Sequence, residues 1–354
     1  MYERPNEGPK PGANKMHALP MPVVIIGEPL TELLSRESVQ SEFEFTKRYS
    51  GDVLTTAVAV ARQTIPTSLV TRLAADPFGQ GIADLLAKEN ISWPTQRFME
   101  TQGPQGCSTG LVIRARGNAD VSAFVYYRKN SASALLCPDD LPENAFSPKT
   151  PGILFASGIS MAISESARKT VLHGFKHARA AGWTTVFDPN YRPDLWQKTS
   201  KYLEAMAQIL PLTDVLSLST PGDCRPLCNL TQPEQVLDYL SYQGVPLVIL
   251  KAADEGCYIR FRGETMTIPA YWPESLPPAI GSLDAIGAGD AFNGGLIAGL
   301  AQRQSLLACA QRGVITAGLY LYRQQGLSEL PTRDELNRLL EPANIRSQWD
   351  TGRL

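Results

Sequence analysis

The sequence predicts an α/β fold in which helices cover both faces of a mostly parallel central sheet. After residue 150, short apolar runs alternate with longer segments of helical periodicity, an order typical of parallel strands joined by helices. The first apolar run, 23–26, is β-branched and ends at a glycine, as in a buried parallel strand. Between residues 105 and 130 the sequence pattern changes to two strand-like runs that flank a turn. This pattern predicts a small β-lid beside the main sheet.

Each further element follows one of these patterns. Segment 52–63 is alanine-rich with helical spacing, and 107–114 and 121–128 flank the hairpin signal Ala-Arg-Gly-Asn-Ala. We expect the hairpin to pair with strands near 32–48, above the carboxyl ends of the sheet strands, where such sheets bind ligands. The other expected strands are 68–73, 153–156, 184–187, 215–218 and 247–250, and the other expected helices are 79–88, 164–182, 199–210, 232–243, 288–302, 306–323 and 332–340.

Composition excludes several classes of protein. The chain has 354 residues, 43% of them hydrophobic, which is enough for a sizeable core. A net charge of −2 gives no field that would attract nucleic acid or an anionic membrane, and we see neither a signal peptide nor a membrane span. The six cysteines are scattered, and Cys224 and Cys228 match no common zinc or redox spacing. We therefore expect reduced thiols and a cytoplasmic protein.

The most informative segment is 284–292, which reads Asp-Ala-Ile-Gly-Ala-Gly-Asp-Ala-Phe before an apolar helix. Gly287 and Gly289 allow close approach of a ligand to the backbone, and the helix N-terminus favours negative charge. Asp290 at the mouth of this site suggests a general base for phosphoryl transfer. A tight turn with an aspartate N-cap is an equally good reading of these residues alone. The P-loop pattern is absent, and Phe292 stands where a dinucleotide-binding loop has its third glycine.

This segment resembles the D-T-x-G-A-G-D-x-F signature of the ribokinase-like (phosphofructokinase-B type) carbohydrate kinases, with Ala285 in place of the threonine. Segments 23–34, 50–62 and 76–79 are similar to other motifs of this family, so the resemblance extends from about residue 22 to 340. It implies ATP-dependent phosphorylation of a sugar hydroxyl, with Asp290 as base. The amides of Gly287, Ala288 and Gly289 would stabilise the transferred phosphoryl group.

Composition and the resemblance together predict a domain plan, since residues 1–20 are rich in Pro, Gly and polar residues. We expect a disordered leader at 1–20, one kinase domain at 21–342 with lid strands from about 32–48 and 105–130, and a C-terminal tail at 343–354. Relatives often pair through their lids, which implies a homodimer. The expected partner is a small-molecule sugar or sugar acid, with no nucleic acid and no membrane.

Three segments are candidates for binding the sugar. Tyr126 and Arg128 share one face of a strand, and 126–132 is similar to the substrate segment of 2-keto-3-deoxygluconate kinases, in which the arginine contacts the acid end. Arg192 belongs to a D-x-N-x-R motif after a strand. Gly51 and Asp52 resemble the glycine turn that admits the sugar, although Ser50 and Thr55 depart from the pattern. An exposed strand face and a capped turn are the alternatives for the first two.

The match to the family's motifs is less complete for the residues expected to bind the nucleotide. The resemblance implies that Ser219, Lys251, Gly256, Gly287 and Gly289 bind ATP and that Asp223 contacts Mg²⁺ through water. Ser219 and Asp223 stand in a degraded N-x-x-E segment, and Ala253 replaces a glycine of the phosphate turn. His173 and His177 are one helical turn apart but lack a third metal ligand.

Three functions remain open at this point. The first is a kinase for a keto-deoxy sugar acid such as 2-keto-3-deoxygluconate. The second is a kinase for another sugar, such as fructose or 5-keto-2-deoxygluconate. The third is a catalytically weak sugar- or nucleotide-binding regulator.

Overall fold

The computed structural model describes residues 19–38, 44–101, 106–116, 122–273, 285–323 and 326–340. Nearly all of the expected leader, the whole expected tail, the expected turn after Arg116 and Asp284 of the signature lie outside these residues. Among the residues described, no helix combines the length and the apolar character needed to cross a bilayer.

The main sheet has nine strands within the described residues, in the order β15-β14-β13-β12-β11-β10-β1-β4-β6. The seven strands from β13 to β6 are parallel, and β14 and β15 add an antiparallel edge. This is the mostly parallel sheet that the sequence predicts. The strands are β1 (Val23–Ile26), β4 (Thr67–Val70), β6 (Ile91–Ser92), β10 (Ile153–Ser157), β11 (Thr184–Asp188), β12 (Val215–Ser219), β13 (Leu247–Lys251), β14 (Cys257–Phe261) and β15 (Glu264–Ile268).

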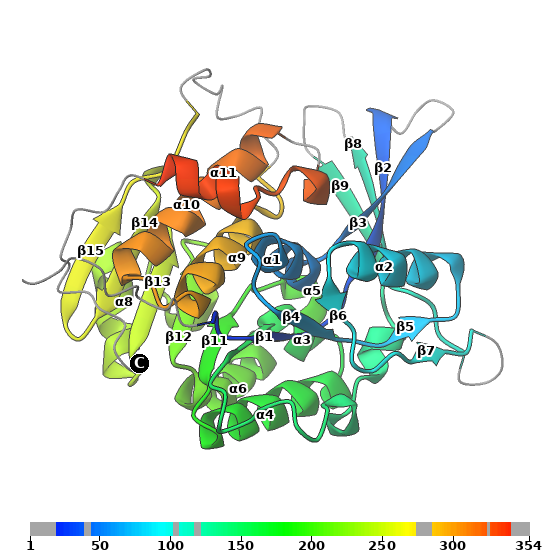
Figure 1. Ribbon diagram of the computed structural model, residues 1–354, viewed down its shortest axis with the longest axis horizontal. Coiled ribbons are helices and arrows are strands. Elements are labelled where there is room, and N and C mark those ends of the chain that lie inside the picture. The colour runs from blue at the N-terminus through cyan, green and yellow to red at the C-terminus, as the bar shows by residue number, and fades with distance from the viewer. Residues whose placement is uncertain are drawn as a thin grey trace, which may run out of the picture.

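Helices cover both faces of this sheet (Figure 1). Alternate residues of β1 point to opposite sides: Val23 and Ile25 pack with α1, α9 and α10, whereas Val24 and Ile26 pack with α4, α6 and α8. The helices are α1 (Asp52–Ala61), α2 (Pro77–Lys88), α3 (Gly158–Ala162), α4 (Glu165–Ala180), α5 (Pro193–Trp196), α6 (Thr199–Ile209), α7 (Cys224–Cys228), α8 (Pro233–Tyr242), α9 (Ala288–Ala301), α10 (Leu306–Arg323) and α11 (Arg333–Leu339).

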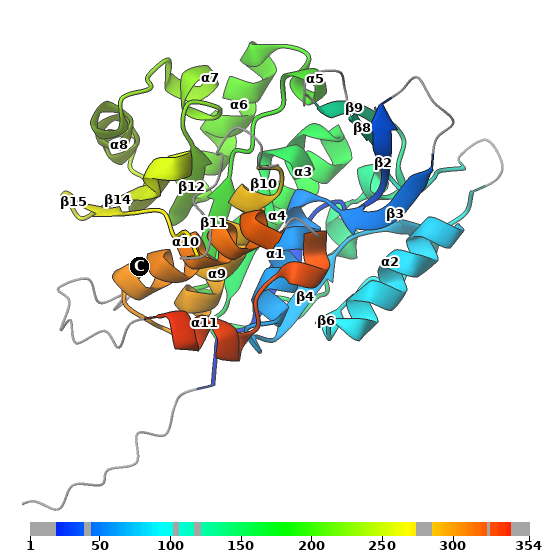
Figure 2. The same ribbon diagram turned by 90° about the horizontal axis from the view of Figure 1, so that it is seen from above.

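A second, four-stranded sheet stands at one end of the main sheet (Figure 2). Its strand order is β3-β2-β8-β9, from β2 (Leu30–Ser38), β3 (Phe45–Ser50), β8 (Leu111–Arg116) and β9 (Ser122–Tyr127). β2 pairs antiparallel with β3 and parallel with β8, so the predicted hairpin joins the strands near 32–48. We call this element the small sheet.

Two predicted strands differ from the structure. The strand expected at 68–73 stops at Val70, and the short β5 (Leu73–Ala74) pairs instead with β7 (Phe98–Met99). The carbonyl of Thr71 between them accepts a hydrogen bond from Trp93 Nε1 at 2.9 Å. The strand expected from residue 107 begins only at Leu111, because Thr109 donates from its amide and hydroxyl to Asp76, both at 2.8 Å. That carboxylate also caps α2.

Candidate active site

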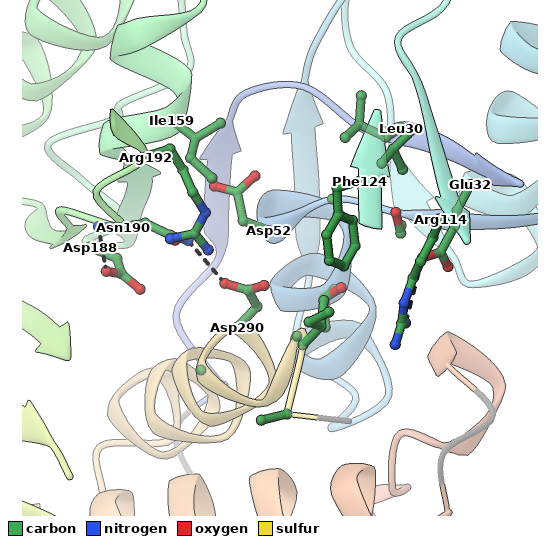
Figure 3. A pocket seen from close by; sticks show the side chains of 18 of the residues that line it. Leu30, Glu32, Asp52, Arg114, Phe124, Ile159, Asp188, Asn190, Arg192 and Asp290 are labelled. Carbon is green, nitrogen blue, oxygen red and sulfur yellow. Dashed lines mark hydrogen bonds and ion pairs between the residues drawn. The ribbon is translucent and has the colours of Figure 1, made fainter. Parts of the chain in front are cut away.

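The carboxyl ends of β10 to β13 and the N-termini of α1 and α9 open into one cavity of about 430 Å³ beneath the small sheet (Figure 3). Open parallel sheets place their ligands at such strand ends. The predicted site residues that line this cavity are Gly51, Asp52, Tyr126, Arg128, Arg192, Ser219, Asp223, Lys251, Gly287, Gly289 and Asp290.

Asp290 is the third residue of α9, and its carboxylate faces the cavity between Asn190 and Asp52 (Figure 3). Asn190 Nδ2 donates to Asp290 Oδ1 at 3.3 Å. Burial, followed by the negative charges of Asp52 and Asp188, raises the pKa of Asp290 to about 7. A carboxyl group that titrates near neutral pH can accept a proton in its ionised form, so the geometry suits a general base.

Gly287 is required by two features of the turn before α9. Its φ angle is +82°, and a Cβ atom at this position would lie 2.7 Å from the hydroxyl oxygen of Tyr320. In the same turn the amide of Ala288 donates to the carbonyl of Ala285 at 3.2 Å. That amide therefore has a partner inside the turn, and its role toward the transferred phosphoryl group stays a prediction.

Lys251 lies at the end of β13, next to this turn. Its Nζ donates to Asp188 Oδ2 at 2.7 Å, and a Cβ on Gly289 would lie 3.6 Å from the same Nζ. Asn293 Nδ2 also donates to Asp188 Oδ2 at 2.6 Å, and Ser217 Oγ donates to Asn293 Oδ1 at 2.7 Å. These side chains are buried, so the network holds the ammonium group of Lys251 beside the start of α9.

A second cavity of about 280 Å³ lies on the other side of the α9 N-terminus. Ser219, Lys251 and Gly289 line both cavities, whereas Gly256 and Ala288 line only the second. Gly256 has a φ of +98°, and a Cβ there would lie 2.1 Å from the carbonyl oxygen of Ile268. Much of the wall is apolar, as suits a nucleoside: Ala270, Tyr271, Trp272, Phe292, Val314, Ala317 and Leu321.

Asp223 is buried at the floor of the first cavity. Its Oδ1 accepts from the amide of Tyr191 and its Oδ2 from the amide of Ser219, both at 2.7 Å. Burial and the nearby charge of Asp188 raise the pKa of Asp223. Both carboxylate oxygens are already hydrogen-bonded, so the geometry fits a contact to Mg²⁺ through water rather than direct ligation. The described residues contain no cluster of three or more His, Cys, Asp or Glu that could hold a metal.

The turn before α1 forms another wall of the first cavity. Gly51 has a φ of +114°, and a Cβ there would approach the carbonyl oxygen of Glu28 to 3.0 Å, so glycine is needed for the close packing of β2. Asp52 begins α1 and accepts a hydrogen bond from the hydroxyl of Ser157. Burial raises the pKa of Asp52.

Arg128 is paired with a buried carboxylate, which the sequence did not indicate. Its Nε donates to Glu28 Oε2 at 2.7 Å, its Nη2 contacts the same carboxylate, and Ser131 donates to the other oxygen. Tyr126 lies on the same face, as predicted, with its ring centre 5.8 Å from the guanidinium carbon. Arg192 is exposed and reaches over the cavity toward Asp52 and Asp290 (Figure 3).

Sequence reasoning missed several polar residues of the site. Glu28 and Asn293 directly support the predicted residues, yet only the place of Glu28 after a strand end and of Asn293 on the buried face of α9 could have indicated them. Asn190 is the asparagine of the predicted D-x-N-x-R motif, but its contact with Asp290 was not expected. Glu32, Arg48, Arg114 and Tyr320 also line the first cavity. The two histidines stack at 4.1 Å between ring centres, well away from this site in a separate groove.

Comparison with known proteins agrees with this architecture. A family model described as pfkB family carbohydrate kinase matches residues 23–333. A 2-dehydro-3-deoxygluconokinase of Escherichia coli K12 is 30% identical over 310 residues, covering 83% of this chain and 93% of the relative. A protein of the same name from Bacillus subtilis is 28% identical over 298 residues, covering 84% and 87%. A fructokinase of Vibrio alginolyticus is 26% identical over 324 residues, covering 90% and 98%.

Solved structures share the fold. The PfkB protein from Polaromonas sp. JS666 has a TM-score of 0.74 at 26% identity, covering 90% of this chain and 99% of its own. Aminoimidazole riboside kinase from Salmonella enterica, solved with aminoimidazole riboside and an ATP analog, has a TM-score of 0.75 at 22% identity over the same shares. The second likeness concerns the fold alone.

Proposed function

The chain belongs to the pfkB family of carbohydrate kinases, and from this premise we propose that it transfers a phosphoryl group from ATP to a hydroxyl of a keto-deoxy sugar acid such as 2-keto-3-deoxygluconate. Several relatives carry the equivalent name 2-dehydro-3-deoxygluconokinase. The observation that carries the mechanism is the place of Asp290, at the start of α9 where the two cavities meet. The first cavity would hold the sugar and the second the nucleoside of ATP.

Asp290 would take the proton of the acceptor hydroxyl as its oxygen attacks the γ-phosphorus, while the bond from phosphorus to the ADP oxygen breaks. The amides of Gly287, Ala288 and Gly289 would stabilise the transferred group, although that of Ala288 also has a partner in the turn. Lys251 would add a fixed positive charge on the path between the cavities. Mg²⁺, held near Asp223 through water, would neutralise the ATP phosphates.

Arg192 and Arg128 would have different roles. Arg192 is exposed at the reacting end, so it can contact an incoming anionic acceptor or the transferred phosphoryl group. Arg128 faces the same cavity but is neutralised by Glu28, and we propose that it mainly positions the sugar-binding wall. The small sheet would close over the sugar and exclude water, which otherwise accepts the phosphoryl group.

The experiment is a measurement of ADP release with 2-keto-3-deoxygluconate, 5-keto-2-deoxygluconate and fructose. We expect 2-keto-3-deoxygluconate to have the highest kcat/KM, by about tenfold or more over neutral fructose. A higher value for fructose would replace our proposal by the second candidate, which the fructokinase relatives favour. The third candidate, a regulator without turnover, is disfavoured because the base, the glycine turn and both cavities are present.

We also propose that two copies pair through the small sheet. Its outer face exposes apolar and aromatic side chains, among them Phe45, Val125 and Tyr127, with exposed fractions of 43%, 49% and 58%. Sedimentation should give a dimer for the native chain and a monomer for Tyr127→Glu. A native chain that sediments as a monomer at micromolar concentration would contradict this pairing.

A further inference from the structure

A surface groove of about 530 Å³ lies between α4 and α6, outside both cavities of the proposed active site. The two helices lie side by side on one face of the main sheet (Figure 1). The ends of two short helices also line the groove, with Ala162 and Ile163 at the end of α3 and Trp196 and Gln197 at the end of α5. The proposed mechanism does not use this groove.

Helix α5 connects the groove to the sugar cavity. It is a single turn: Arg192, which precedes it, lines the sugar cavity, whereas Trp196 and Gln197 at its end line the groove. The amide of Gln197 donates to the carbonyl of Pro193 at 3.1 Å, and this bond closes the turn. A displacement of Trp196 would therefore move the backbone that carries Arg192.

Helix α3 makes a second connection. Ile159 near its start lines the sugar cavity, while the end of the same short helix lines the groove. A Cβ atom on Gly158 would lie 2.0 Å from the carbonyl oxygen of Pro189, so α3 packs tightly against the loop that holds Asn190. Because the side chain of Asn190 contacts Asp290, a shift of α3 would reach the proposed base.

Arg168 of α4 lines the groove and contacts both short helices. Its Nε donates to the carbonyl of Met161 in α3 at 3.2 Å. Its guanidinium carbon lies 5.2 Å from the ring centre of Trp196 in α5, a stacking distance for a cation and an aromatic ring. The bond to Met161 uses only Nε, so the paired N–H donors of Nη1 and Nη2 suit an oxyanion.

The charges of the groove also favour an anion. The described residues place three cations there, Arg168, Lys169 and Lys201, against the two carboxylates Glu165 and Glu204. Lys169 pairs with Glu165 at 2.8 Å, whereas Lys201 is exposed on α6. The groove therefore has an excess of one positive charge, and two of its cations come from different walls.

The end of α5 has two further features of a ligand site. The indole Nε1 of Trp196 is buried and has no hydrogen-bond partner among the described residues, and an unsatisfied buried N–H group destabilises the fold. Gln197 has a φ of +59° and a ψ of −40°, a backbone conformation that is uncommon for residues other than glycine. Such strained residues cluster at ligand clamps and switch regions.

We propose that this groove binds a small oxyanion, a phosphate or carboxylate group on a metabolite, and that its occupation moves Arg192. The anion would bind Nη1 and Nη2 of Arg168 and the ammonium group of Lys201. Arg168 would then shift from its contacts with Met161 and Trp196, and α3 and α5 would move with it. The sugar cavity would bind its acceptor more weakly, because Arg192 lies at its reacting end.

Calorimetric titration with inorganic phosphate and with succinate, at constant ionic strength, tests binding without any catalysis. The variants are Arg168→Met and Lys201→Met, and the matched control is Lys176→Met, which removes an exposed positive charge from α4 outside the groove. We expect Kd for the better probe to rise about tenfold or more in Arg168→Met and about threefold in Lys201→Met. The control should change Kd by less than about twofold. Which probe binds better identifies phosphate or carboxylate as the recognised group.

Two outcomes would overturn the groove site. Either neither probe binds saturably, or a probe binds equally well to wild type and to both groove variants and so occupies another cavity. Because Lys201 is exposed on α6, Lys201→Met keeps this test decisive even if Arg168→Met lowers Tm.

The coupling is tested by the KM for 2-keto-3-deoxygluconate with and without the better probe at saturation. We expect KM to rise about fivefold in the wild type, at the lower end of ordinary allosteric couplings, and to stay unchanged in Arg168→Met. If no acceptor is phosphorylated, calorimetric binding of the same sugar acid replaces KM, so failure of the kinase proposal is distinguishable from failure of the groove. A probe that binds in the groove without altering sugar-acid affinity would overturn the link to Arg192.

Discussion

Replacing Asp290 by asparagine separates two explanations of the same residue. If the carboxylate only stabilises the start of α9, its loss costs about 0.3–1 kcal/mol of stability. If it is a buried base, its ionised form destabilises the folded state. Its pKa rises from 3.8 to about 7, and a shift of about three units corresponds to a cost of about 4 kcal/mol for the ionised form.

We therefore expect Asp290→Asn to lose activity and gain stability. The loss of the base should lower kcat by about 10²–10⁴-fold. At pH 8 the neutral asparagine removes the cost of the buried charge, and after subtraction of the lost helix interaction we expect a gain of about 3 kcal/mol. For a chain of this length that gain raises Tm by about 4 °C.

The sign of the pH dependence gives a second check. The pKa of Asp290 is higher in the folded than in the unfolded chain, so its contribution favours the folded state at low pH and is lost as pH rises from about 4 to about 7. The stability gain of the variant should therefore shrink to about 1 kcal/mol at pH 5 and disappear near pH 4. Wild-type kcat/KM should fall about tenfold per pH unit below pH 7, because the base becomes protonated.

The assays are ADP release and thermal unfolding, each measured from pH 5 to pH 8. Asp84→Asn is the control, since it makes the same chemical change on the exposed face of α2 and should alter neither quantity. A variant that keeps wild-type turnover and is less stable at pH 8 would refute the assignment of Asp290 as general base. Asp290 would then only stabilise the start of α9. A wild-type activity that stays flat down to pH 5, with the fold intact, would refute the raised pKa.

Three further changes test other parts of the site. Lys251→Met should lower kcat by about 100-fold or more with little change in sugar KM, because the fixed charge acts on the transferred group; an effect on KM alone would contradict this. Arg128→Met should destabilise the fold by about 3–5 kcal/mol, measured by urea unfolding, since Glu28 is left buried and unpaired; unchanged stability would show the pair to be dispensable. Gly287→Ala should cost about 1–3 kcal/mol and most of the activity, and Tyr320→Phe should restore part of both by removing the contacting oxygen; a fully active Gly287→Ala would contradict the close packing.

Local patterns in the sequence were enough to locate most elements of the main sheet. Helix α9, predicted at 288–302, spans Ala288–Ala301, because a glycine turn followed by a continuous apolar run leaves few alternatives. The antiparallel edge strands Cys257–Phe261 and Glu264–Ile268 escaped prediction, since their residues are of mixed polarity and their stability comes from pairing within the sheet, β14 with β13 and β15 with β14. Their hairpin lacks a strong local signal.

The site was predicted one residue at a time, but its chemistry depends on pairs that are distant in sequence. Glu28 and Arg128 are 100 positions apart, and Asp188 and Lys251 are 63 apart. Each arginine or lysine could be recognised as a candidate for binding an anion. Whether its charge is free for a ligand depends on a partner that only the folded chain brings next to it.

The two cavities share a wall, and this has a thermodynamic consequence. Lys251, Ser219 and Gly289 belong to both, so an occupant on one side changes the field and the shape that the other occupant meets. Any factor by which the acceptor tightens ATP must equal the factor by which ATP tightens the acceptor. Discrimination between acceptors can thus be expressed as a difference in nucleotide affinity.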